Sequence, residues 1–156
     1  ENLKMAKPDA TKEEMEAVLQ KVNLLGFLQT QDGLQTQLLE KASNLSGGQC
    51  QRLVIARALL RTDSAVYIFD EAASNIDVES EELIMNVIHE LAKTKTVLLI
   101  SHRLANVVKS DKIYFLKDGE IKESGKHDEL MSRNGAYRHL YESQMALENY
   151  GKGGMA

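Results

Sequence analysis

Three small residues, Ser46, Gly47 and Gly48, stand at the start of a helical pattern and are of types suited to holding a phosphate. A serine hydroxyl, glycine N–H groups and the positive end of a helix dipole all favour an anion. Glycine also lets a ligand approach the backbone closely. The alternative is structural, with Ser46 as a helix N-cap and the glycines in a turn. The surrounding sequence must decide between the two.

Two carboxylates, Asp70 and Glu71, follow the apolar run 65–69, whose lack of alternation predicts a strand buried on both faces of a parallel sheet. Ligands of open α/β sheets bind beyond the carboxyl ends of strands. If the strand continued, the two side chains would point in opposite directions and would serve different tasks. The alternative is that these acids cap the next element.

His102 follows a second apolar run, residues 96–100, and therefore also lies at the carboxyl end of a predicted strand. An imidazole in that place can contact a phosphate. It could equally be an ordinary polar loop residue. We interpret the other three histidines as structural; they are His89, His127 and His139.

The positioning elements can be predicted from caps and periodicity. Thr11 and Glu14 have capping-box spacing and predict a helix over 11–22, which Gly26 would help to end. Residues 28–44 predict a loop or short helical pieces, and a helix begins at Ser46. A helix that Asp77 could cap separates the two predicted strands, giving a strand, helix, strand crossover.

The remainder of the chain predicts a hairpin and further helices. Strands over 113–116 and 120–122 flank the Asp118-Gly119 pair, which favours a tight turn. Helical patterns cover 128–131 and 137–147, and residues 151–154 predict a frayed tail.

Composition excludes several classes of protein. The 156 residues are 43% apolar and 27% charged, enough for one globular domain, and the net charge of −4 disfavours nucleic-acid binding. No apolar run approaches the roughly 20 residues that span a bilayer, and the amino terminus does not resemble a secretory peptide. Cys50, the single cysteine, predicts no internal disulfide; at a helix start it is either a reactive thiol or a neutral filler.

Several motifs together resemble the nucleotide-binding domain of ATP-binding cassette (ABC) transporters. The run Leu45-Ser-Gly-Gly-Gln49 and the helical sequence to Leu59 resemble the family's signature helix. Asp70-Glu71, Ser74-Asn-Ile-Asp77 and Ser101-His-Arg-Leu104 resemble its later motifs, although the family usually has Ser-Ala-Leu-Asp at the second of these. The start of the chain, and residues 111–137, are similar to exporters with a fused membrane domain.

The resemblance implies an α/β fold: part of a three-layer P-loop NTPase-like domain with a parallel sheet and flanking helices, plus a helical signature subdomain. The implied divisions are 1–62 for the helical subdomain, 63–150 for the C-terminal part of the ATPase core and 151–156 for a flexible tail.

The resemblance also implies roles for residues. The nucleotide-binding set is Ser46, Gly47, Gly48, Gln49 and Asp77. Asp70 would hold Mg²⁺ through water, Glu71 would be the general base and His102 would sense the γ-phosphate of ATP. Asp77 would help to couple two ATP sites, or would simply cap a helix.

No Gly-x-x-x-x-Gly-Lys-Ser/Thr phosphate loop occurs in the sequence, so we expect this chain alone not to hydrolyse ATP. The implied partners are a second nucleotide-binding domain and a membrane-spanning domain, at the cytoplasmic face of the cell membrane. Residues 97–100 would form an apolar sheet edge, which predicts self-association or marginal stability of this chain alone. The alternatives are a non-transport ABC ATPase and a non-catalytic interaction module.

Overall fold

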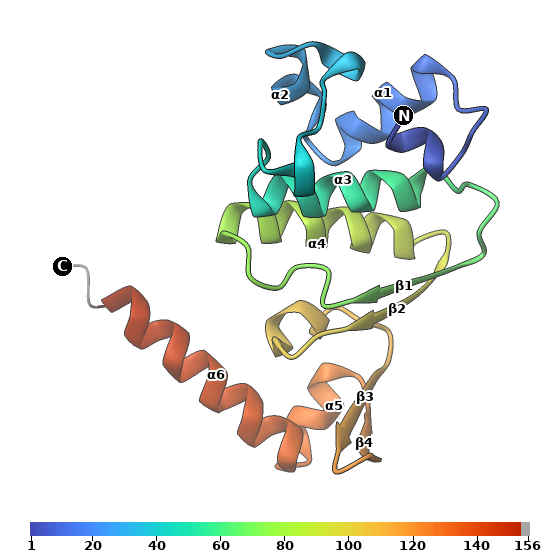
Figure 1. Ribbon diagram of the computed structural model, residues 1–156. Coiled ribbons are helices and arrows are strands. Elements are labelled where there is room, and N and C mark those ends of the chain that lie inside the picture. Colours follow the sequence, from blue (N-terminus) through green and yellow to red (C-terminus); the bar gives the residue numbers. More distant parts are fainter. Residues whose placement is uncertain (154–156) are drawn as a thin grey trace. The chain divides into compact units, whose positions relative to one another are not determined.

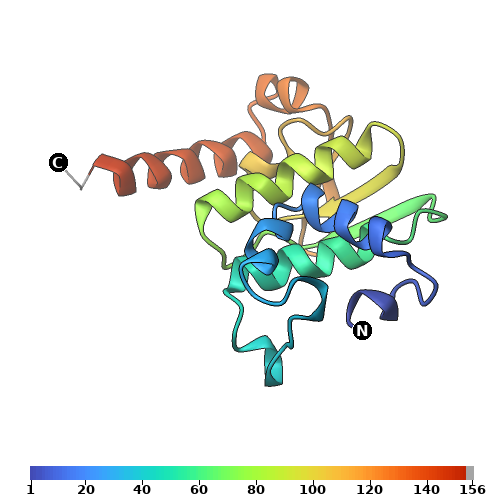
Figure 2. The same ribbon diagram turned by 90° about the horizontal axis from the view of Figure 1, so that it is seen from above.

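The computed structural model describes residues 1–153, with side chains described through residue 148. The chain divides into two compact units, Glu1–Ile100 and Ser101–Ala156. This division by contacts differs from the motif-based one at residue 62, which stays a prediction. Figures 1 and 2 show the elements of both units.

The first unit is mainly helical and ends in two strands. Its elements are η1 (Leu3–Met5), α1 (Lys12–Lys21), α2 (Leu25–Gln29), η2 (Gly33–Gln35), η3 (Glu40–Ala42), α3 (Gly47–Leu59), β1 (Val66–Asp70), α4 (Val78–Ala92) and β2 (Thr96–Ile100). The predicted short helical pieces between residues 28 and 44 are η2 and η3, together with the end of α2.

Helix α1 begins as its capping box predicts. The Thr11 hydroxyl accepts a hydrogen bond from Glu14 N–H at 3.2 Å, and the Glu14 carboxylate accepts one from Thr11 N–H at 3.0 Å. The prediction for its end was wrong. Gly26 lies inside α2, and the chain leaves α1 through Asn23, which has a positive φ of 51°. Asparagine tolerates this left-handed conformation, so it can end a helix as glycine does.

The predicted crossover from strand through helix to strand is confirmed. Strands β1 and β2 pair in parallel, from Val66 beside Thr96 to Asp70 beside Ile100. Helix α4 connects them, and in both ribbon views α3 lies beside α4 (Figures 1 and 2). The core joins the helices to one face of the sheet, with Ile84 and Ile88 of α4 and Tyr67 and Phe69 of β1 all buried.

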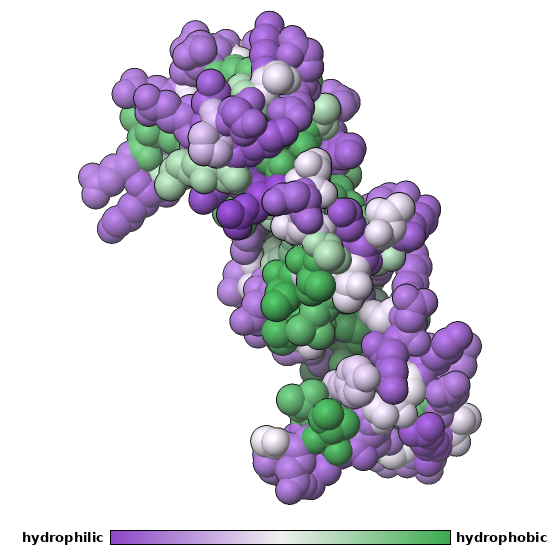
Figure 3. Space-filling view, turned by 90° about the vertical axis from the view of Figure 1, so that its right-hand side faces the viewer, coloured by the Kyte–Doolittle hydropathy of each residue, from purple (hydrophilic) through white to green (hydrophobic). Residues whose placement is uncertain are grey.

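The prediction that β1 is buried on both faces was wrong. Its burial alternates: Tyr67 and Phe69 are buried, whereas Val66 and Ile68 are 56% and 65% exposed. Leu98 and Ile100 of β2 are also exposed. Within residues 1–100 the helices pack on one face of the two-stranded sheet, so the other apolar face has no cover from this unit. Figure 3 shows green, apolar residues gathered at the height of β1 and β2 in Figure 1.

The second unit contains a hairpin and the last helices. Its elements are η4 (Leu104–Val107), β3 (Ile113–Lys117), β4 (Glu120–Gly125), α5 (His127–Ser132) and α6 (Ala136–Gly153). The antiparallel hairpin turns at Asp118 and Gly119, which have φ values of 53° and 76° and thus the two left-handed residues of a tight turn. The turn prediction is confirmed.

The start of α6 is held by side chains of neighbouring elements. The Glu123 carboxylate accepts a hydrogen bond from Tyr137 N–H at 2.7 Å. Burial raises the pKa of the Tyr137 hydroxyl, which lies 2.9 Å from Nδ1 of His127. His127 therefore takes part in the packing of this unit. Helix α6 extends through Gly153, so residues 151–153 of the predicted tail are helical, and residues 154–156 lie outside the described part of the chain.

Among the described residues, no helix is both long and apolar enough to cross a bilayer.

Candidate functional site

The amino-terminal turn of α3 is built by Ser46 and Gln49. The Ser46 hydroxyl accepts a hydrogen bond from Gln49 N–H at 3.2 Å, and Gln49 Oε1 accepts one from Ser46 N–H at 2.8 Å. Cys50 N–H donates to the Ser46 carbonyl at 2.9 Å. Helix geometry gives the N–H groups of Gly47 and Gly48 no acceptor within the helix. These two amides therefore stand at the positive end of a 13-residue helix, where an anion is favoured.

Gly48 has a second role that the sequence did not reveal: it lets α3 pack closely against the start of α4. A Cβ added at Gly48 would collide with Ser80 Oγ and would lie 2.7 Å from Ser80 Cβ and 3.1 Å from Asp77 Oδ2. A Cβ at Gly47 would meet no atom within 4 Å. The structure thus brings the signature residues and Asp77 together.

Asp77 is the N-cap of α4. Its Oδ1 accepts a hydrogen bond from Ser80 N–H at 2.8 Å. Hydrogen bonds from the backbone and side chain of Ser80, with a smaller contribution from the Arg52 charge, hold the pKa of the Asp77 carboxyl below its usual value. The capping interpretation of Asp77 is confirmed, while its coupling role stays a prediction.

Asp70 and Glu71 lie at the carboxyl end of β1, as predicted, but the strand does not continue through them. Asp70 is the last strand residue, and Glu71 has a positive φ of 49°. Glu71 N–H donates to the Ile100 carbonyl at 2.9 Å, and its own carbonyl accepts from Ser74 N–H at 3.0 Å. These bonds hold a non-glycine residue in a left-handed conformation, which is uncommon and concentrated at functional sites.

His102 belongs to the second unit and lies two residues beyond β2 in the chain. Its side chain is exposed, and its backbone carbonyl accepts a hydrogen bond from the Gln144 side chain at 2.7 Å. The adjacent turn is closed by the Ser101 hydroxyl, which accepts from Arg103 N–H at 3.0 Å.

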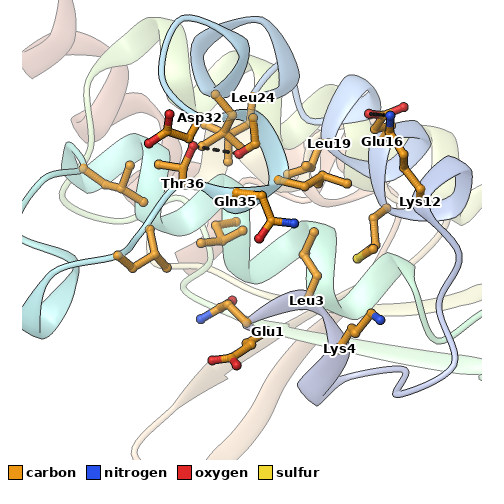
Figure 4. Close-up of a pocket in the computed structure, with 18 residues that line it drawn as sticks. Glu1, Leu3, Lys4, Lys12, Glu16, Leu19, Leu24, Asp32, Gln35 and Thr36 are labelled. Atoms are coloured by element: carbon orange, nitrogen blue, oxygen red, sulfur yellow. Dashed lines mark hydrogen bonds and ion pairs between the residues drawn. The ribbon is translucent and has the colours of Figure 1, made fainter.

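A cavity of about 640 Å³ lies within the first unit, among residues 1–53. Residues of η1, α1, α2, the segment ahead of α3 and α3 itself line it. Apolar side chains such as Leu3, Leu19 and Leu24 lie beside polar ones such as Gln35 (Figure 4). Asp70, Glu71 and Asp77 are not among the lining residues. The lining includes Leu45 and Leu53, on either side of the phosphate-suited Ser46, Gly47 and Gly48, but none of these three residues.

Metal-binding capacity in the described part of the chain is limited. No group of three or more His, Cys, Asp or Glu side chains lies close enough to hold an ion. A single exposed carboxylate such as Asp70 suits Mg²⁺, which keeps several waters and commonly takes phosphate oxygens as ligands. The residues fit Mg²⁺ that arrives with a nucleotide.

Comparisons with known proteins agree on one family. The profile of the family described as ABC transporter matches residues 1–74. An ABC transporter ATP-binding protein of Haemophilus influenzae is 52% identical over 148 residues, which cover 95% of this chain and 26% of that protein. An ATP-dependent lipid A-core flippase of Mannheimia succiniciproducens is 46% identical over 140 residues, covering 89% of this chain and 24% of the flippase.

A solved structure agrees with these relatives. A bacterial Atm1-family ABC exporter with ATP bound is similar with a TM-score of 0.82 and 30% identity, over 92% of this chain and 25% of the exporter chain. The chain belongs to the ABC transporter family. As a part of an ABC ATPase domain it has the predicted α/β fold, with a parallel sheet and flanking helices. It spans about a quarter of the length of its ABC relatives.

Proposed function

We propose that this chain supplies one part of the ATP-hydrolysing domain of an exporter. The observation that carries the proposal is the start of α3, where the amides of Gly47 and Gly48 stand free of intrahelical partners beside the Asp77 cap. This is an anion-binding arrangement, and one solved relative of the family has ATP bound. The names of the relatives, a lipid A-core flippase and an ABC exporter, support export as the process that is powered.

The residues of this chain would divide the work. Ser46, Gly47, Gly48 and Gln49 would bind the γ-phosphate of a nucleotide held by a second nucleotide-binding domain. Mg²⁺, when bound with ATP, supplies charge that stabilises the transferring phosphoryl group.

Four side chains would serve the other tasks. Asp70 would hold the waters around Mg²⁺, and Glu71 would accept a proton from the attacking water. His102 would contact the γ-phosphate, and Asp77 would connect the two nucleotide sites through its place beside Gly48.

We also propose two partners and a location. The second nucleotide-binding domain would complete the shared ATP site, and a membrane-spanning domain would contact the helical part, where the half-apolar cavity offers a surface for it. The chain would therefore work at the cytoplasmic face of the membrane. The exporter-type relatives favour this over a non-transport ATPase or a non-catalytic module.

The test uses this chain alone and a hybrid. In the hybrid, the upstream part of a related exporter domain that contains a phosphate loop precedes this chain. We expect Mg²⁺-dependent ATP hydrolysis by the hybrid and a loss of about 10³-fold in kcat with Glu71→Gln, as for removal of a general base. The chain alone should show no turnover. Turnover by the chain alone that Glu71→Gln abolishes, or an active hybrid that Glu71→Gln leaves unchanged, would contradict the proposal.

A further inference from the structure

The segment that carries His102 is held by one side chain of α6. Gln144 Oε1 accepts a hydrogen bond from Leu104 N–H at 2.9 Å, and Gln144 Nε2 donates to the His102 carbonyl at 2.7 Å. One turn further along α6, Glu148 pairs with the Arg103 guanidinium at 3.1 Å. One face of α6 therefore contacts three successive residues of this segment.

The amide of Gln144 is suited to this position because both of its ends are used. The carbonyl end accepts and the NH₂ end donates, so turning the amide over would set donor against donor and acceptor against acceptor. The two bonds lie on either side of Arg103 and fix the backbone direction there. Leu104 is buried, which anchors the segment on one side, whereas the His102 side chain is exposed. The backbone from which the imidazole projects is thus the part of His102 that Gln144 holds.

We propose that Gln144 is a positioning residue for His102. The proposal rests on the γ-phosphate contact proposed for His102, and it makes α6 part of the support of the nucleotide site. Gln144 touches no reacting atom in this role. It acts by keeping the His102 carbonyl and Leu104 N–H in place, so that the imidazole needs no rearrangement when a phosphate arrives.

The first experiment measures the two hydrogen bonds of Gln144 to His102 and Leu104, here called the Gln144 clamp. It uses the full 156-residue chain without any nucleotide. Gln144→Ala should speed amide hydrogen exchange at Leu104 about three- to ten-fold, as expected for one lost hydrogen bond. It should also shift the NMR resonance of the His102 imidazole and leave that of His139 in place. Ser143→Ala is the matched control, because the exposed Ser143 hydroxyl donates a hydrogen bond to the His139 carbonyl within α6 itself. A folded Gln144→Ala chain with both readouts unchanged would overturn the proposal.

Gln144→Glu decides the case if Gln144→Ala also exposes the amides of β3 and β4. Glutamate keeps the acceptor for Leu104 N–H and loses the donor to the His102 carbonyl. Leu104 should stay protected while the His102 resonance shifts. An unshifted His102 resonance would count against Gln144 as its positioning residue.

The second experiment separates this proposal from the proposed function. In the hybrid domain, Gln144→Ala should lower kcat about ten-fold and change the KM for ATP by less than about two-fold. His102→Ala should lower kcat at least as much. If His102→Ala has no effect, the proposed role of His102 fails, and the exchange data still decide the clamp. If His102→Ala lowers kcat and Gln144→Ala does not, the positioning role is refuted.

Discussion

At the scale of single residues, the two glycines of the signature differ in what surrounds them. Gly48 faces Ser80 and Asp77 at contact distance, whereas Gly47 faces open space. Gly48→Ala should therefore destabilise the chain by about 1 to 3 kcal/mol, because the new methyl group must push α3 away from α4. Gly47→Ala should be neutral or slightly stabilising, since alanine favours a helix over glycine. Urea unfolding of both variants measures the difference, and equal free energies of unfolding would contradict this reading of the contact.

The backbone conformation of Glu71 also depends on its surroundings in the fold. The sequence predicts Glu71 at the end of a strand, with its side chain opposite to that of Asp70 if the strand continued. In the structure Glu71 has a left-handed conformation, and backbone hydrogen bonds with Ile100 and Ser74 support it. Such a conformation depends on hydrogen bonds made after the fold has formed, so residue type alone could not predict it.

At the scale of elements, the cap of α4 predicts a dependence of stability on pH. Hydrogen bonds from Ser80 lower the pKa of Asp77 in the folded chain below the ordinary aspartate value of 3.8. A group with a lowered folded pKa adds stability above its unfolded pKa and loses it as the pH falls through the folded pKa. The stability contributed by Asp77 should therefore be complete at neutral pH, begin to fall near pH 3.8 and be lost as the pH drops through the lower folded pKa.

Asp77→Asn isolates this contribution, because asparagine also caps helices and does not titrate. The free energy of unfolding of the wild-type chain should exceed that of the variant at neutral pH, and the gap should close in acid. Other acids with lowered pKa values, such as Glu14 beside Lys7, contribute equally to both chains, so their effect on the free energy of unfolding cancels in the comparison. A gap that stays constant from neutral pH into acid would refute a titrating cap.

Much of the element structure could be predicted from local signals. Thr11 with Glu14, and Asp118 with Gly119, each act over three residues or fewer and produced the expected cap and turn. Ser46 caps α3, as the structural alternative for this residue predicted. Contacts between distant residues could not be predicted. Gln144 reaches His102 across 42 positions, and its role depends on how α6 packs. One-sided burial of β1 likewise depends on which elements cover the sheet.

At the scale of the whole molecule, the apolar face of the β1–β2 sheet that the helices of residues 1–100 do not cover predicts self-association. Val66, Ile68, Leu98 and Ile100 expose between 45% and 65% of their area. An exposed apolar patch of this kind favours association with another chain. The average mass in sedimentation experiments should therefore rise with concentration for the isolated chain. A monomer that melts cooperatively in dilute solution, and stays monomeric as it is concentrated, would refute this prediction.

The paired substitutions Ile68→Lys and Leu98→Lys should suppress that rise, since both positions are exposed in neighbouring strands. Val78→Lys is the matched control, because Val78 is 75% exposed at the start of α4, outside the sheet. If Val78→Lys also suppresses the rise of average mass with concentration, the suppression is due to net charge and not to the sheet face.

The left-handed conformation of Glu71 has a consequence for engineering this domain. Glycine adopts a φ of 49° more easily than glutamate, so a library selected only for thermal stability should enrich Glu71→Gly. That enrichment would remove the carboxylate proposed to activate water. Directed evolution of this protein therefore needs an activity screen at every round, because selection for heat resistance alone rewards loss of the proposed base.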